Sequence, residues 1–241
     1  MQIVVDNLLV SYESIGSGEK VILFLHGWQR SLKDWLSYAR LLEKDYRVIV
    51  LDLPGFGASI RPEGTFSIFD YAEFVGHFLE KLSIKSCVLV GHSFGGRIGV
   101  IMAAESSYVS KLILVDSGGI EKKTLKSWLW LGLAKTAAFF VPQPIRNGLR
   151  EKVGSTDYKQ AAGMRDIFVK VVNQDLTHLF SKIKIPTLII WGELDAVLPF
   201  AQAKVFKKGI VGSQLRVIWA TGHDPHLESP AEFTEALTDF L

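Results

Sequence analysis

The chain has few cysteines and lacks long apolar runs. Its 241 residues include one cysteine, Cys87, which excludes an internal disulfide and, within an apolar run, predicts a buried thiol. The longest apolar stretch, residues 127–141, is interrupted by Lys135 and is too short to span a bilayer, so we expect no stable membrane insertion. The first seven residues have neither a basic segment nor a sustained apolar segment, so we expect no signal peptide and a cytoplasmic protein.

Strong charge and phosphate-binding loops are also missing. The formal net charge is +2, which gives no reason to expect a nucleic-acid partner. The glycines at 91, 95 and 96 are not followed by Gly-Lys-Ser/Thr, and no Gly-x-Gly-x-x-Gly opens the first strand–helix turn, so no nucleotide cofactor is expected. Hydrophobic residues make up 48% and charged residues 22%, an ordinary composition for a globular protein. We expect a monomer or a homodimer.

Near-continuous apolar runs alternate with helical patterns along most of the chain. A hairpin is predicted from residues 2–6 and 8–14, ahead of the first apolar run. Buried strands are predicted at 21–25, 48–51, 87–90, 112–115, 187–191 and 215–219. Helices are predicted at 31–44, 67–82, 96–105 and 199–208, with a last helix that begins after Ser229 as cap and Pro230. This alternation predicts an α/β fold with a mainly parallel, doubly wound sheet and helices on both faces.

One segment departs from the alternation. Residues 121–182 have no buried-strand pattern but several helical stretches, with aromatic residues near their start. We interpret the segment as a helical cap inserted into a core domain of residues 1–120 and 183–241. The segment carries eleven Lys or Arg and five Asp or Glu. Solvated helix faces account for such a surplus, and attraction of an anionic substrate is the alternative.

The strand beginning at Cys87 runs into Gly91-His-Ser-Phe-Gly95, and a helix follows. A Gly-x-Ser-x-Gly sequence between a strand and a helix is typical of a nucleophile elbow, a strained turn that lifts the serine hydroxyl above the sheet. Glycines suit the flanking positions because the strand and helix backbones pass close to the turn. Ser93 is therefore a candidate nucleophile.

A serine hydroxyl needs a base to take its proton and a third group to hold that base. Two later strands end in suitable groups, since 187–191 runs into Gly192-Glu-Leu-Asp195 and 215–219 runs into Ala220-Thr-Gly-His223. The carboxyl ends of parallel strands meet at one edge of the sheet, where the elbow also lies. Serine, aspartate and histidine follow in the chain order associated with this elbow.

On these motifs the sequence resembles the α/β-hydrolase superfamily over essentially its whole length. The resemblance implies Ser93 as nucleophile, His223 as general base and acid, and Asp195 as the orienting carboxylate. It also implies an oxyanion hole formed by the backbone N–H groups of Trp28 and Phe94, and a helical cap. The matching segments are His26-Gly27, Asp52-Leu-Pro-Gly-Phe-Gly-Ala-Ser59, Gly91-His-Ser-Phe-Gly-Gly96, Gly192-Glu-Leu-Asp195 and Gly222-His-Asp-Pro-His-Leu-Glu-Ser-Pro230.

Other residues compete for some of these roles. Asp116, at the end of the 112–115 strand, is an alternative carboxylate, and His226 is an alternative base that more simply packs near the last helix. The pair His223 and His226 lacks further ligands and the helical spacing of a zinc motif, so no metal is expected. His26 is expected to hold the loop that carries Trp28.

The function predicted is that of a serine hydrolase that cleaves a small carboxylic ester with an apolar acyl or aryl group. A carbon–carbon bond hydrolase, a thioesterase or a lyase with the same three residues remains an alternative. A ligand receptor without catalytic activity is a further alternative. Trp128 and Phe139 are candidate pocket residues, and so is Arg97, although an internal salt bridge is the simpler role for this arginine.

Overall fold

The computed structural model describes residues 1–121 and 164–241. Its centre is an eight-stranded sheet with the order β1-β2-β4-β3-β5-β6-β7-β8. The pairs β1–β2 and β2–β4 are antiparallel, and the remaining neighbours are parallel, which confirms the mainly parallel sheet. The strands are β1 (Gln2–Val5), β2 (Leu8–Ile15), β3 (Lys20–Leu25), β4 (Tyr46–Leu51), β5 (Cys87–His92), β6 (Val109–Val115), β7 (Thr187–Gly192) and β8 (Gln214–Ile218).

The predicted hairpin forms one edge of this sheet. Its turn residues Asp6 and Asn7 both have positive φ, at 48° and 62°. Two such residues match a two-residue turn that suits the right-handed twist of paired strands, and Asp and Asn tolerate this conformation well. The turn therefore fixes the register that pairs Val5 with Leu8.

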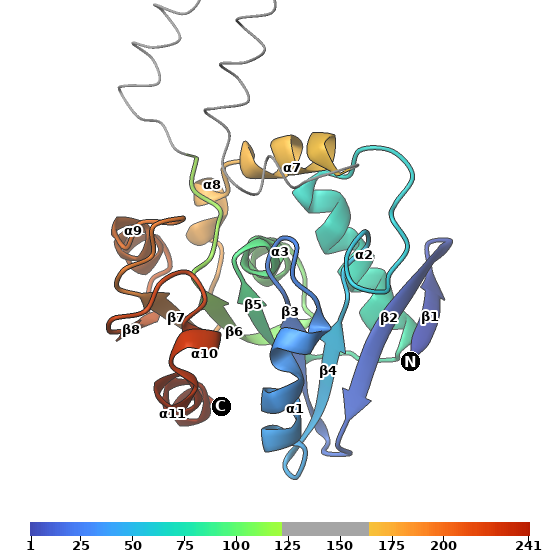
Figure 1. The fold of residues 1–241 in the computed structure, drawn as a ribbon, viewed down its shortest axis with the longest axis horizontal. Helices are drawn as coiled ribbons and strands as arrows, with labels where there is room; N and C mark the ends of the chain where they lie inside the picture. Colours follow the sequence, from blue (N-terminus) through green and yellow to red (C-terminus); the bar gives the residue numbers. More distant parts are fainter. Residues whose placement is uncertain (122–163) are drawn as a thin grey trace, which may run out of the picture.

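Helices cover both faces of the sheet, as predicted (Figure 1). Apolar residues of α1 and α11 pack on one face, against strand residues such as Phe24 and Val50. Apolar residues of α2, α3, α8 and α9 pack on the other face, in one cluster with strand residues such as Leu23 and Ile189. The helices are α1 (Leu36–Leu42), α2 (Ile68–Lys81), α3 (Phe94–Glu105), α7 (Arg165–Val172), α8 (Thr177–Phe180), α9 (Ala201–Gly209), α10 (Pro225–Glu228) and α11 (Pro230–Phe240).

Local sequence signals explain some helix ends and fail at others. Ser67 and Asp70 form a reciprocal capping box at the start of α2, which satisfies two free N–H groups. The single helix expected at 31–44 is instead a 3₁₀ turn, Leu32–Trp35, followed by α1. Ser229 precedes Pro230 at the start of α11 as expected, but its side chain makes no capping hydrogen bond.

The chain returns to the core through α7, which lies beside α2 and α3 (Figure 1). Gln174, just after α7, accepts a hydrogen bond from the backbone N–H of Ile68 at 2.9 Å. Both α7 and α8 belong to the predicted cap, residues 121–182, of which residues 122–163 lie outside the described part of the chain. The division into core and cap stays a prediction. Within residues 1–121 and 164–241, no helix has the length and apolar composition needed to cross a membrane.

Candidate active site

Ser93 lies between β5 and α3, in a strained backbone conformation with φ of 48° and ψ of −100°. The residues two positions before and after it must be glycines, because a Cβ atom on Gly91 would lie 2.5 Å from the carbonyl oxygen of Gly95. A Cβ atom on Gly95 would lie 2.4 Å from the carbonyl oxygen of Leu25. Such strain persists only where the surrounding structure holds it, and it is common at active sites. The turn is that of the predicted nucleophile elbow.

The structure brings Ser93, His223 and Asp195 together, although β5 is separated from the other two residues by about half the chain. His223 Nε2 lies 3.0 Å from Ser93 Oγ, and His223 Nδ1 lies 2.8 Å from Asp195 Oδ2. A carboxylate can only accept, so Nδ1 carries the proton and donates to Asp195. Nε2 is then free to accept the Ser93 proton, which is the tautomer that base catalysis requires.

The Asp195 carboxylate is fixed on both of its oxygens. While Oδ2 faces His223, Oδ1 accepts hydrogen bonds from the backbone N–H groups of Val197 and Leu198 at 2.7 and 2.8 Å. Burial raises the pKa of this carboxyl, but the hydrogen bond and charge of His223 and the bond from Leu198 outweigh it and bring the pKa below its ordinary value. Asp195 is therefore ionised at neutral pH.

The loop after β3 places Trp28 beside Phe94, with the two ring centroids 5.3 Å apart. Within the described part of the chain, neither backbone N–H of these two residues donates a hydrogen bond. His26 holds the loop, since its Nε2 accepts from Leu53 N at 3.0 Å and its Nδ1 donates to Gly27 O at 2.7 Å. Burial lowers the pKa of His26 to about 4, so its ring is neutral and suited to this structural role.

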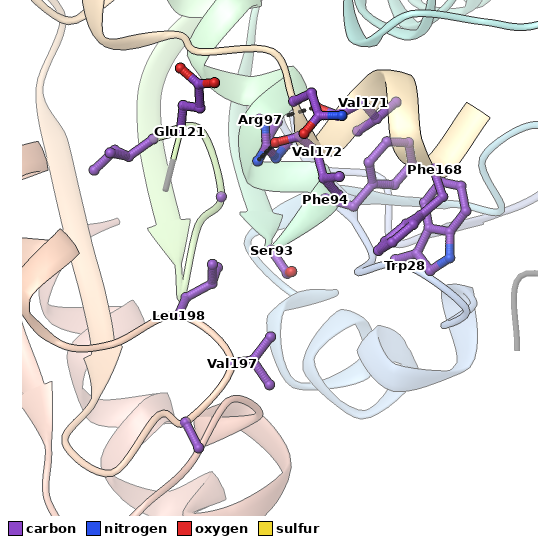
Figure 2. Close-up of a pocket in the computed structure, with 14 residues that line it drawn as sticks. Trp28, Ser93, Phe94, Arg97, Glu121, Phe168, Val171, Val172, Val197 and Leu198 are labelled. Atoms are coloured by element: carbon purple, nitrogen blue, oxygen red, sulfur yellow. Dashed lines mark hydrogen bonds between the residues drawn. The ribbon is translucent and has the colours of Figure 1, made fainter. Parts of the chain in front are cut away.

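A cavity of about 560 Å³ opens onto Ser93. In Figure 2, Trp28 and Phe168 lie on one side of the Ser93 hydroxyl, and Val197 and Leu198 lie on the other. Most residues of the described wall have apolar side chains, and Ser93, Arg97, Glu121 and Asn173 add polar groups. Its members are Trp28, Ser93, Phe94, Arg97, Gly118, Ile120, Glu121, Phe168, Val171, Val172, Asn173, Ala196, Val197 and Leu198. The predicted pocket residues Trp128 and Phe139 lie outside the described residues.

Arg97 lines this cavity. The charge of Asp175 acts on its guanidinium and opposes the lowering of its pKa by burial. The guanidinium donates to the backbone carbonyls of Val171, Gln174 and Val172, at 3.1, 3.0 and 3.3 Å. These carbonyls lie at the end of α7, where a positive charge also interacts favourably with the helix dipole. Arg97 thus ties α3, the helix that follows Ser93, to α7.

Asp116 does not hold His223, contrary to the alternative left open by the sequence. The carboxyl group of Asp116 accepts a hydrogen bond from Gly192 N at 3.0 Å, and His223 is held by Asp195. Sequence reasoning missed that the carboxyl groups of Asp116 and Asp195 lie close together: one side-chain oxygen of each and one ring nitrogen of His223 lie within 4.8 Å of one another. The sequence did place both residues after predicted strands, and pairing of those two strands would have brought the residues together.

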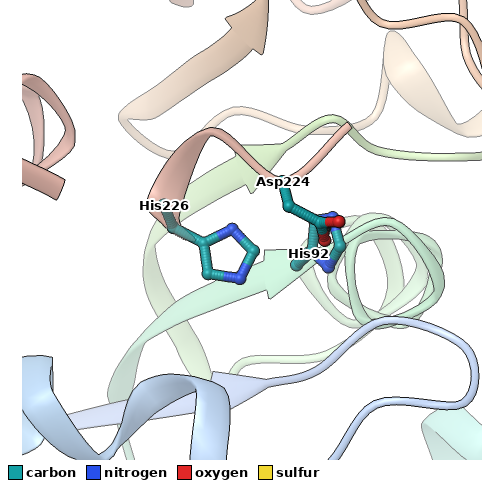
Figure 3. A group of neighbouring side chains, drawn as sticks. All are labelled: His92, Asp224 and His226. Carbon is teal, nitrogen blue, oxygen red and sulfur yellow. Dashed lines mark ion pairs between the residues drawn. The ribbon is translucent and has the colours of Figure 1, made fainter. Parts of the chain in front are cut away.

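A second histidine cluster lies behind His223. One ring nitrogen each of His92 and His226 and one carboxylate oxygen of Asp224 lie within 4.8 Å of one another. The three side chains are drawn in Figure 3. However, His92 Nε2 donates to the carbonyl of His223 at 2.9 Å, and Arg30 forms an ion pair with Asp224. The His226 ring stacks on Trp35, with centroids 4.4 Å apart. A guanidinium at the carboxylate opposes a cation, so this arrangement favours packing and support of His223 over metal binding.

A family model described as the alpha/beta hydrolase fold matches residues 20–163 of the chain. The chain belongs to this family. Membership confirms the fold expected from the motifs, and the eight-stranded, mostly parallel sheet is the family's core. This α/β hydrolase carries its elbow serine, its histidine and its aspartate at the ends of β5, β8 and β7.

Similar proteins include lipases and esterases. Monoacylglycerol lipase ABHD6 of Mus musculus is 29% identical, with 91% of this chain and 75% of the mouse protein covered. The crystal structure of a membrane phospholipase A, a bacterial virulence factor, has a TM-score of 0.80 at 27% identity, covering 100% of this chain and 84% of its own. The esterase EaEST from Exiguobacterium antarcticum has a TM-score of 0.78 at 26% identity, covering 100% and 98%. The protein is thus an α/β hydrolase related to lipases and esterases.

Proposed function

We propose that this α/β hydrolase is a serine esterase that cleaves a small carboxylic ester with an apolar acyl or aryl group through an acyl-enzyme. The observation that carries the proposal is the pair of hydrogen bonds that links Ser93 to His223 and His223 to Asp195, at a cavity that Ser93 lines together with mostly apolar side chains. A binding protein without turnover would need neither the strained elbow serine nor a base in the acceptor tautomer.

In the proposed reaction, His223 Nε2 takes the Ser93 proton as Oγ attacks the ester carbonyl carbon. The negative oxygen that develops is held by the N–H groups of Trp28 and Phe94, each of which contributes on the order of 3 kcal/mol to transition-state stabilisation. His223 then protonates the leaving alcohol. Water attacks the acyl-enzyme with His223 again as base, and Asp195 stabilises the imidazolium that forms twice in the cycle.

The cavity supports an apolar acyl or aryl group. Trp28, Phe168 and Leu198 present apolar surface close to Ser93, and burial of each methylene of an acyl chain contributes roughly 0.8 kcal/mol to binding. The relatives named as a monoacylglycerol lipase and an esterase act on carboxylic esters by name, so the substrate panel includes nitrophenyl esters and monoacylglycerols of increasing chain length.

The proposal is tested with the Ser93→Ala variant and a fluorophosphonate label. Wild-type protein is expected to hydrolyse nitrophenyl esters and to be labelled on Ser93, and Ser93→Ala is expected to lose both properties. Ser110→Ala is the matched control, because the Ser110 hydroxyl bonds to the carbonyl of Cys87 at the opposite end of the strands. Full esterase activity in Ser93→Ala, or tight ligand binding by a wild type without turnover, would contradict the proposal.

A further inference from the structure

We propose that Asp116 is a positioning residue that stays protonated and donates its O–H to the Asp195 carboxylate. The inference rests on the proposed esterase function, in which Asp195 orients His223. In this arrangement the two carboxyl groups share one proton and carry one negative charge between them.

The fold forces the two carboxyl groups together. Parallel pairing of β6 with β7 sets Val115 beside Ile190, so the strand end at Asp116 lies next to the one that leads to Asp195. Asp116 is fully buried, and its backbone has a positive φ of 39°. Among the residues that the structure describes, the titratable groups that face it are Asp195, His223 and, farther away, Asp224. One oxygen of Asp116 lies within 4.8 Å of one oxygen of Asp195, and two buried carboxyl groups at such a distance strongly disfavour a second negative charge.

The number of donors decides which carboxyl keeps the proton. Asp195 accepts from His223, Val197 and Leu198, and three donors strongly favour the ionised form. Within residues 1–121 and 164–241, Asp116 has one donor, Gly192 N, at 3.0 Å from one oxygen and 3.3 Å from the other. Burial, followed by the hydrogen bond and charge of Asp195, raises the pKa of Asp116 to about 10.

The O–H of Asp116 gives Asp195 a fourth donor and prevents the carboxylate from turning away from His223. It also withdraws charge from Asp195, which moderates the basicity of His223. An ionised Asp116 would do the reverse, because a second negative charge near the imidazole raises its pKa. The two protonation states therefore predict opposite effects of neutral substitutions.

The first experiment compares pH profiles of kcat/KM. Asp116→Asn keeps a neutral donor and an acceptor for Gly192, and Asn tolerates positive φ. We expect its kcat/KM to lie within about threefold of wild type with an unmoved acid limb, because the interaction is retained. Asp116→Ala removes the donor, and we expect a fall in kcat/KM of about 10- to 100-fold, as for lost support of a site residue. An acid limb of Asp116→Asn lowered by about one unit or more would show that an ionised carboxylate had been removed, and would overturn the proposal.

The second experiment does not depend on activity. Infrared difference spectra between wild type and Asp116→Asn at neutral pH are expected to show the carbonyl band of a buried carboxylic acid in wild type only. Asp239→Asn, at an exposed ion pair with Arg216, is the control and should leave the band in place. Absence of the band in wild type would refute a protonated Asp116 whatever the enzyme hydrolyses, whereas loss of the esterase function would be seen separately in Ser93→Ala.

Discussion

Replacing Asp195 by asparagine probes the orientation of His223 without changing the size of the side chain. The carboxylate Oδ1 accepts from Val197 N and Leu198 N, and Oδ2 accepts from His223 Nδ1. In Asp195→Asn the amide oxygen keeps the two backbone donors, so the NH₂ group faces His223. Nδ1 must then accept, the ring proton moves to Nε2, and Nε2 can no longer take the proton of Ser93.

Rotation of the amide group would restore the active tautomer of His223, but the structure makes this rotation unfavourable. Turning the amide over would break both backbone bonds, at about 1 kcal/mol each, and would place the NH₂ group against two N–H donors. We therefore expect kcat to fall by about 10³- to 10⁴-fold with little change in KM, as for the equivalent change in other serine hydrolases.

The assay is hydrolysis of a nitrophenyl ester by Asp195→Asn, with urea unfolding as a check that the fold is intact. The double variant Asp116→Asn/Asp195→Asn tests whether the carboxyl group of Asp116 takes over the role of Asp195 in the single variant. A loss smaller than tenfold in both variants would refute the assigned tautomer.

Two further predictions concern stability. Arg97→Met removes three hydrogen bonds to the end of α7. We expect the free energy of unfolding to fall by about 1–3 kcal/mol and hydrogen exchange in α7 to accelerate. Unchanged exchange would argue against a role of Arg97 in holding α7 to α3. His26 and His226 are buried with pKa values lowered, chiefly by burial, to about 4 and about 3. Because unfolding lets them bind protons, the stability that these two histidines contribute is complete above about pH 6.5. It is lost as the pH falls from there towards their folded pKa values, by up to about 1.4 kcal/mol per pH unit for each histidine. His226→Phe, which keeps the stacking on Trp35, should reduce this slope in acid unfolding curves, and an unchanged slope would contradict the assignment.

Much of the fold followed from the sequence because buried parallel strands are near-continuous apolar runs. The structure keeps several predicted strand ends and shifts the others by one to three residues, as for β7, which continues to Gly192. The break in the 31–44 helix could not be foreseen, since the 3₁₀ turn at Leu32–Trp35 depends on a tertiary contact. The backbone N–H of Leu32 donates to the distant carboxylate of Asp52 at 2.7 Å.

The meeting of Ser93, Asp195 and His223 was predictable because each follows a strand, and strand ends share one edge of a parallel sheet. The sequence alone did not decide whether Asp195 or Asp116 holds His223, because both residues follow strands and both reach the site. The partners of Arg97 were not predictable, because they are the backbone carbonyls of Val171, Val172 and Gln174, more than 70 positions away. Such contacts depend on how the chain returns through α7.

The central claim is that Ser93 carries the acyl group during turnover. It is tested most directly by quenching the reaction with a nitrophenyl ester in acid and measuring the intact mass and the peptide map of the protein. We predict a mass increase equal to one acyl group, on the peptide that contains Ser93, and no adduct in Ser93→Ala. Steady ester hydrolysis with the acyl group on another residue, or with activity intact in Ser93→Ala, would contradict the account.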